Sequence, residues 1–200
     1  MKSLIKTILV VLLLSVPLIM QWTPLEIIKL KTFDALVTEK QQSNYFTVLN
    51  ITEEDIEREG GWPLPRARLA EIQREIIARG ALGVGWTVAF PQKDRLGGDE
   101  YFAESLLGSN SILAMYENEG SGYPNTVGTV IMGEPVGGYP VSGVVQNIEI
   151  LRRSAAQGIA SAPVDVDQLV RRIPLLMKTP DGWVSAFGTE VLKALVGSDT

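Results

Sequence analysis

The chain has 200 residues, of which 46% are hydrophobic and 20% are charged, a balance typical of one globular domain with a buried core. Its net charge of −5 argues against a nucleic-acid-binding protein, because such proteins usually carry a basic surface that displaces counterions. The sequence contains no cysteine and no histidine, which excludes disulfides and thiolate chemistry and removes the usual general base and the commonest metal ligand. We therefore expect neither enzymatic activity nor a cofactor.

The N-terminal segment is the exception to this globular composition. Residues 7–25 carry no charge, and about 20 apolar residues are needed to cross a hydrocarbon core of roughly 30 Å. Lys2 and Lys6 precede the run, so the positive-inside rule predicts a cytoplasmic N-terminus, a periplasmic or extracellular remainder, and Trp22 at the interface. We predict a single-pass transmembrane signal anchor over residues 1–25. A cleaved signal peptide is the main alternative, although no A-x-A-like site follows the run, and a buried core helix is the third.

The next segments predict a stalk followed by alternating strands and helices. Residues 26–44 form the stalk, with a helix over 26–40. Residues 45–51 are rich in β-branched and aromatic side chains, which predicts a strand. Apolar residues at helical spacing predict a helix over 65–79, and Gly80 ends it as a glycine after the last turn commonly does.

Two further strands are expected with a helix between them. Residues 81–90 form an almost continuous apolar run, too short for a typical helix, which predicts a strand buried on both faces of a parallel sheet. A helix beginning near Asp99 and a strand over 111–116 follow. The alternation of strands and helices predicts right-handed crossovers in a parallel α/β sheet. Gly83 and Gly85, inside the first of these strands, are expected to permit close packing of a neighbouring helix or strand.

The second half of the chain begins with a long surface excursion. Residues 117–143 are dominated by glycine, proline, serine and asparagine, with one short strand expected over 129–132. The remaining predicted elements are a helix over 144–157, strands over 158–162 and 169–178, turns over 163–167 and 180–182, and a final helix capped by Ser185. The predicted fold class is therefore α/β: a mixed, mainly parallel sheet flanked by helices and preceded by one N-terminal transmembrane helix.

Familiar catalytic motifs are absent from the sequence. It contains neither a P-loop nor a G-x-S-x-G motif, and Gly80, Gly83 and Gly85 lie at the wrong end of their strand for a dinucleotide fingerprint. The acidic stretch over 53–59 lacks the alternating spacing of a calcium loop, so a solvated helix face is favoured over a metal site. We predict no catalytic, cofactor-binding or metal-binding residues.

The start of the helix over 65–79 is the most distinctive feature. Two prolines fix the direction of the chain there, and Trp62 precedes them. Arg66 and Arg68 lie near the positive end of the helix dipole, which is unfavourable by a few tenths of a kcal/mol up to about 1 kcal/mol, so they need an anionic neighbour. In an α/β sheet this helix would begin at the carboxyl edge, where Asp99 also lies.

We therefore predict a site made of Trp62, Arg66, Arg68 and Asp99. An internal ion pair of Arg66 with Asp99 or with a carboxylate of residues 53–59 is favoured. A site for a small ligand or anion and a contact with a partner protein remain as alternatives.

These residues, in this order, resemble the type-two CHASE domain, an extracellular sensory domain named for cyclases and histidine kinases. The segments that carry the resemblance extend from about Phe33 to Leu195. They are Gly61-Trp-Pro-x-Pro-Arg66, a helix ending in Arg79-Gly-Ala81, Phe90-Pro91, Asp99, Gly158-Ile-Ala160, the aspartate turn from Asp165 to Asp167, and Val170-Arg-Arg-Ile-Pro-Leu-Leu176.

The resemblance implies that residues 45–200 are an extracytoplasmic sensor domain, truncated at its C-terminus. Such a domain relays a stimulus to a cytoplasmic nucleotide cyclase or kinase outside this chain, and the family resemblance also implies a homodimer. A membrane-anchored scaffold without ligand or output is the alternative. The sequence departs from the family pattern at Thr52 and Trp86, where aspartates are usual, which puts the binding chemistry of those two acids in doubt.

Overall fold

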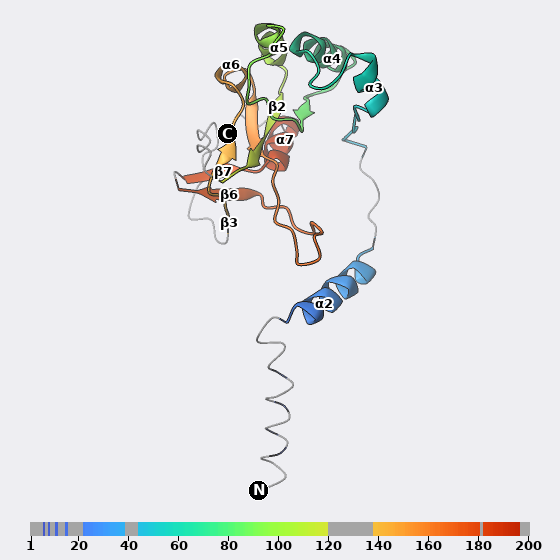
Figure 1. Cartoon of the computed structure of the whole chain (residues 1–200), viewed down its shortest axis with the longest axis vertical. Helices are drawn as coiled ribbons and strands as arrows, with labels where there is room; N and C mark the ends of the chain where they lie inside the picture. Colours follow the sequence, from blue (N-terminus) through green and yellow to red (C-terminus); the bar gives the residue numbers. More distant parts are fainter. Residues whose placement is uncertain are drawn as a thin grey trace. The chain divides into compact units, whose positions relative to one another are not determined.

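The computed structural model of the protein describes residues 6, 8, 11, 15, 22–38, 44–119, 138–180 and 182–196 (Figure 1). The chain divides into two compact units. The first unit contains residues 1–49 together with 164–171, and the second contains residues 50–163 and 172–200.

The described part of the first unit is built around helix α2, Thr23–Leu36. This helix confirms the predicted helix of the stalk, although it begins and ends a few residues earlier. Pro24 lies in its first turn, where a missing N–H costs nothing. The predicted transmembrane helix falls largely outside the described residues. Within the parts that the structure describes, no helix combines the length and the apolar composition needed to cross a membrane.

The strand predicted over residues 45–51 is wrong. These residues adopt neither helix nor strand, and the large apolar side chains of Tyr45, Val48 and Leu49 are exposed. A strand requires a hydrogen-bonded neighbour, and none of the strand pairs among the described residues includes this segment. β-Branched and aromatic composition alone therefore did not produce a strand here.

The second unit contains a mixed sheet with strand β2, Ile112–Glu117, at its centre. Strands β1, Gly85–Trp86, and β5, Ala156–Ile159, pair with it in parallel. Strand β4, Val144–Val145, pairs antiparallel with its last two residues. This arrangement confirms the predicted mixed, mainly parallel sheet, but β1 occupies only two residues of the predicted run over 81–90.

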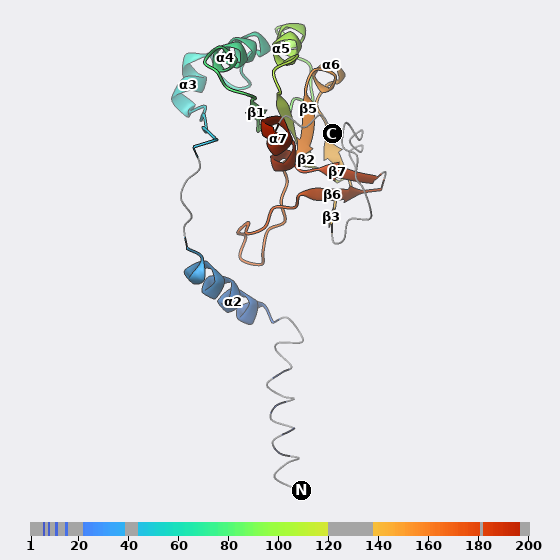
Figure 2. The ribbon, with the colours of Figure 1, turned by 180° about the vertical axis from the view of Figure 1, so that it is seen from behind.

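Helices cover this sheet on both faces. Helices α4, α5 and α6 lie together, whereas α7 lies apart from them against the sheet (Figures 1 and 2). The helices of the second unit are α3, Glu53–Arg58; α4, Arg66–Ala78; α5, Asp99–Leu106; α6, Glu149–Arg152; and α7, Phe187–Val196. Helices α4 and α5 agree with the predicted helices over 65–79 and from Asp99, because proline, glycine and apolar spacing specify their bounds locally.

The register of the strands explains which side chains face which helices. Gly85 pairs with Ile112, and Gly158 pairs with Ala114, so these residues share the face toward α7. A Cβ atom on Gly85 would lie 2.9 Å from a ring carbon of Phe187 in α7, which confirms the predicted close packing. The opposite face carries the first core, formed by Leu64, Leu69, Ala70, Trp86, Phe90, Phe102, Ala103, Leu106, Leu113 and Leu151.

A smaller second sheet lies in the same unit. It has the order β3–β6–β7, with β3 at Tyr139–Pro140, β6 at Leu176–Thr179 and β7 at Gly182–Ser185. A parallel bridge between Ile159 and Ala186 joins β5 to the residue after β7. The second core forms here from Met115, Val141, Val144, Ile159, Met177, Val184 and Ala186.

The helix predicted over 144–157 is wrong, because β4, α6 and β5 occupy this region. The side chain of Asn147 explains the difference. Its Oδ1 accepts the N–H of Phe90 at 2.7 Å, and its Nδ2 donates to the carbonyl of Ala114 at 3.1 Å and to Oε1 of Gln157 at 3.0 Å. These bonds hold the segment against the sheet, so tertiary contacts outweigh the helical spacing of its apolar residues.

Other boundaries also differ from the sequence predictions. The strand predicted over 158–162 is β5, which begins two residues earlier. Only the end of the strand predicted over 169–178 is extended, as β6. Ser185 ends β7, a strand that was not predicted, and the final helix begins two residues later. The strand expected over 129–132 lies outside the described residues.

Candidate functional site

The start of α4 is held by a carboxylate from another part of the chain. Helix α4 has Pro65 at its N-cap position, which offers no side-chain cap to the free N–H groups of the first turn. Asp94, in the loop after β1, supplies the acceptor instead: its Oδ2 accepts the N–H of Arg66 at 3.1 Å. The same oxygen accepts the N–H of Gly98, the N-cap residue of α5, at 3.1 Å. Asp94 therefore joins the starts of two helices.

Hydrogen bonding keeps Asp94 ionised. Burial acts to raise the pKa of Asp94, but hydrogen bonds from the backbone N–H groups of Leu96, Arg66 and Gly98 outweigh it, and the pKa lies below its usual value. The close approach also requires a glycine. A Cβ atom on Gly98 would lie 2.7 Å from the backbone nitrogen of Ala67. A negative charge at two helix starts is electrostatically favourable.

Arg66 and Asp99 are brought together beside this junction. Nε of Arg66 lies 3.6 Å from Oδ1 of Asp99, and the two side chains are only 9% and 10% exposed. The guanidinium carbon of Arg66 lies 4.2 Å from the centre of the Phe90 ring, and Nη2 donates to the carbonyl of Gln92 at 3.4 Å. Oδ2 of Asp99 accepts the N–H of Asp94 at 2.9 Å.

This pair is electrostatic rather than hydrogen-bonded. Neither Nε of Arg66 nor Oδ1 of Asp99 has a hydrogen-bond partner, although both atoms are buried. Burial lowers the pKa of the Arg66 guanidinium, and the charges of Asp99 and Asp94 oppose that effect. The arrangement supplies the anionic neighbour that an arginine in the first turn of a helix needs.

Arg68 and Trp62, the other two residues of the predicted site, have different surroundings. Nε of Arg68 lies 3.0 Å from Oε1 of Glu59, and Nη1 lies 2.7 Å from Oε2 of Glu71. The acidic stretch over 53–59 therefore supplies a partner for Arg68 and not for Arg66. Trp62 is 54% exposed. The four predicted residues are thus the buried pair Arg66–Asp99, the surface arginine Arg68 with two carboxylate partners of its own, and an exposed aromatic ring.

Sequence reasoning missed the junction residue Asp94, although a signal for it existed. Asp94 begins the segment Asp-Arg-Leu-Gly-Gly, and an aspartate that accepts the N–H two residues later is typical of a turn. Its Oδ1 does accept the N–H of Leu96, at 3.2 Å. The contacts of Arg66 with Phe90 and Gln92 have no comparable local signal, because they depend on how the loop folds back.

Thr52 and Trp86, which depart from the family resemblance described above, serve the fold in this chain. Trp86 is buried, and its indole N–H donates to Oε1 of Gln73 at 2.8 Å. Nε2 of Gln73 donates in turn to Oγ of Ser111 at 2.7 Å. Thr52 is the N-cap of α3 and forms a capping box with Asp55. Both departures are therefore explained by local hydrogen bonding.

Comparison with protein families identifies one match over nearly the whole chain. The family described as the CHASE2 domain matches residues 7–199. No curated protein and no solved structure gives a significant match.

Proposed function

Because the chain belongs to the CHASE2 domain family, a family of sensory domains in signalling proteins, we propose that it is the extracytoplasmic input domain of a membrane-bound signalling protein. In this proposal residues 1–25 anchor the chain in the cell membrane with the N-terminus in the cytoplasm. Residues 45–200 receive a stimulus outside the cytoplasm, and the output is a nucleotide cyclase or kinase domain. The observation that carries the proposal is the match to this family over residues 7–199.

Two features of the sequence support the membrane orientation. The uncharged run over 7–25 has the length of a bilayer span, and Lys2 and Lys6 lie on the side that the positive-inside rule assigns to the cytoplasm. Trp22, directly before α2, is exposed, as an aromatic residue at a membrane interface would be.

We propose that the Arg66–Asp99 pair positions the helix starts rather than binding the stimulus directly. An anionic ligand would have to displace Asp99 from a buried guanidinium and would approach the ionised Asp94. Both steps are electrostatically unfavourable. The exposed Trp62 and the half-exposed Arg68 are better placed to meet a small ligand or a partner protein from solvent.

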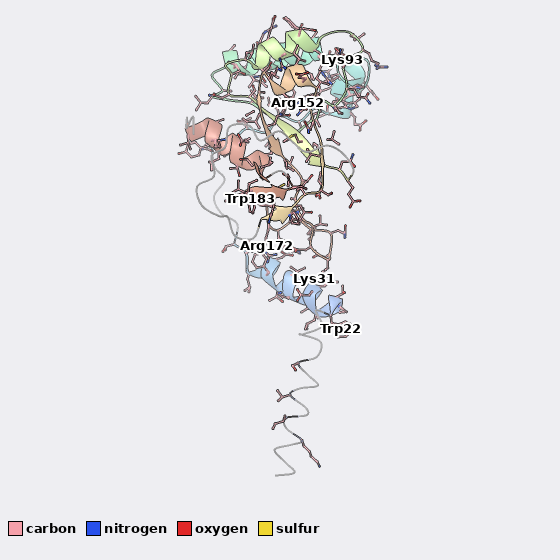
Figure 3. All side chains as sticks on the ribbon, turned by 90° about the vertical axis from the view of Figure 1, so that its left-hand side faces the viewer. Trp22, Lys31, Lys93, Arg152, Arg172 and Trp183 are labelled. Carbon is pink, nitrogen blue, oxygen red and sulfur yellow. The ribbon has the colours of Figure 1, made fainter. Side chains whose placement is uncertain are left out.

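Cysteine labelling tests the proposed topology, because the chain has no cysteine of its own. The variants are Lys93→Cys, in the exposed loop between β1 and α5 (Figure 3), and Lys2→Cys, before the apolar run. A membrane-impermeant maleimide applied to intact cells should label Lys93→Cys and should label Lys2→Cys only after lysis.

The outcomes separate the parts of the proposal. Labelling of both variants only after lysis would overturn the extracytoplasmic location. Labelling of Lys93→Cys on a chain that has lost its first 20 or so residues by mass would instead support the cleaved signal peptide.

A further inference from the structure

Arg171 lies at the centre of three carboxylates from two parts of the chain. Its side chain is only 6% exposed. Nε and Nη2 donate to the two carboxylate oxygens of Asp34 at 2.8 and 2.7 Å. Nη1 and Nη2 donate to the two oxygens of Asp167 at 2.8 and 2.7 Å, and Nη1 also donates to Oδ2 of Asp165 at 3.1 Å. We refer to these four side chains as the Arg171 clasp.

The clasp uses the full hydrogen-bonding capacity of the arginine. A guanidinium has five N–H donors, and the five bonds above occupy all of them. Two of the carboxylates are bound through both oxygens, the geometry that makes arginine–carboxylate pairs strong and directional. The hydrogen bonds from Arg171 lower the pKa of Asp167 to about 2 and lower the pKa of Asp34, so both are ionised at neutral pH.

The two sides of the clasp are 137 positions apart in the sequence. Asp34 lies in the last turn of α2. Asp165 and Asp167 lie in a turn between β5 and β6. Two backbone hydrogen bonds of 2.9 Å close this turn: the N–H of Asp165 donates to the carbonyl of Leu169, and the N–H of Gln168 donates to the carbonyl of Asp165. A closed turn of this kind presents its carboxylates in a fixed arrangement.

Helix α2 needs such a contact to remain ordered. A helix of 14 residues is marginally stable in isolation, so its order depends on tertiary contacts. Those contacts include the burial of Leu30 and the clasp at Asp34. The covalent route from α2 into the second unit includes residues 46–52, which form neither helix nor strand.

We infer that the Arg171 clasp is the coupling element between the turn over residues 164–171 and helix α2. A displacement of that turn, whose two ends continue directly into the second unit, is carried to α2 through the guanidinium of Arg171. The inference rests on the proposed function, in which α2 follows a membrane anchor and the second unit receives the stimulus.

Hydrogen exchange measured by mass spectrometry on the full chain in detergent tests this coupling. Arg171→Gln removes the shared donor from the turn side. Because all five hydrogen bonds of the clasp come from this guanidinium, we expect exchange in both residues 23–36 and 164–171 to accelerate by about tenfold or more. Asp34→Asn weakens only the α2 side and should accelerate exchange in 23–36 while 164–171 stays near the wild-type rate.

The matched control is Lys29→Gln, which breaks the exposed pair of Lys29 with Glu26 inside α2. Exchange in α2 should then stay within about twofold of wild type, because exposed pairs contribute little. The inference is overturned if Arg171→Gln accelerates exchange in 164–171 but leaves α2 unchanged, or if Asp34→Asn leaves α2 unchanged.

Exchange in α4 and α5 reports global unfolding. Should Arg171→Gln accelerate exchange there too, Asp34→Asn alone decides the outcome. The hydrogen-exchange result does not depend on membrane topology. Coupling between α2 and residues 164–171 is compatible with either labelling pattern of Lys93→Cys and Lys2→Cys. Failure of the proposed function and failure of the coupling are therefore distinguishable.

Discussion

The indole N–H of Trp86 and Oε1 of Gln73 form a buried hydrogen bond of 2.8 Å between β1 and α4. Replacing Gln73 with leucine should lower the free energy of unfolding by about 1–3 kcal/mol, because the Trp86 donor would stay buried without an acceptor. Urea denaturation measures the change. Arg79→Gln, which breaks an exposed pair just after the same helix, should change the value by less than about 0.5 kcal/mol. Equal midpoints for Gln73→Leu and wild type would contradict this role of Gln73.

The buried Arg66–Asp99 pair predicts an asymmetric response to mutation. Arg66→Met should cost about 3–5 kcal/mol, because it leaves the carboxylate of Asp99 buried without its cation. Adding Asp99→Asn should recover part of that loss, whereas Arg68→Met, at a side chain that is 44% exposed, should change the stability much less, because exposed ion pairs contribute little. Chemical denaturation of the four proteins gives the comparison. If Arg66→Met is as stable as Arg68→Met, the buried pair does not stabilise the fold, and the alternative that Arg66 binds a ligand is favoured.

The lowered pKa of Asp94 predicts a pH-dependent contribution to stability. Its folded pKa lies below its unfolded value of about 4, so the stabilisation is fully present above pH 4 or so and is lost as the pH falls through the folded pKa. Asp94→Asn should therefore cost about 1–2 kcal/mol at pH 7, comparable to the loss of a helix cap. The difference from wild type should shrink at pH 3. Thermal unfolding at pH 7, 5 and 3 measures it.

The exposed Glu104 of α5 provides the comparison for this measurement. Glu104→Gln keeps the shape of the side chain and removes a charge that is not bound to a helix start. Its difference from wild type should be small at every pH. A difference for Asp94→Asn that does not change between pH 7 and pH 3 would show that the ionised form of Asp94 is not what stabilises the junction.

Two glycines near α7 should respond to alanine in opposite directions. A Cβ atom on Gly158 would lie 2.5 Å from the Cα atom of Phe187, so Gly158→Ala should cost about 1–3 kcal/mol by forcing β5 and α7 apart. A Cβ atom on Gly188, inside α7, would meet nothing within 4 Å. Gly188→Ala should stabilise the protein by about 0.5–1 kcal/mol, since alanine favours helix. Melting temperatures compare the two, and destabilisation of similar size in both would argue against a specific contact at Gly158.

The sequence predicted best those elements whose signals are local. Pro65 and Gly80 enclose α4, and the apolar spacing between them is helical, so its bounds were predicted within one residue. The segment over 144–157 has similar apolar spacing, but Asn147 binds it to Phe90 and Ala114 of two other segments, and it forms strand β4, the short helix α6 and the start of strand β5. The contacts of a side chain with distant segments cannot be predicted from the local spacing of apolar residues.

The ion pairs of the protein also differ in whether the sequence could predict them. Arg66 and Asp99 could be associated from sequence, because α/β topology brings helix starts and strand ends to one edge. The Arg171 clasp could not, because Arg171 and Asp34 are 137 positions apart and come from a turn and a helix that no topological rule connects. The family resemblance included the aspartate turn and the two arginines that follow it. It did not include helix α2, whose Asp34 binds Arg171.

Strand β2 has a further consequence for how the second unit can respond to a stimulus. Leu113 belongs to the first core and Met115, two residues along the same strand, belongs to the second. The two cores therefore share one rigid wall whose contact points are only about 7 Å apart. A shift of β2 would therefore change the packing of both cores. A rearrangement under the α4–α5 layer that moves β2 would therefore also change the contacts of Met115 with Met177 and Val184 of the β3–β6–β7 sheet.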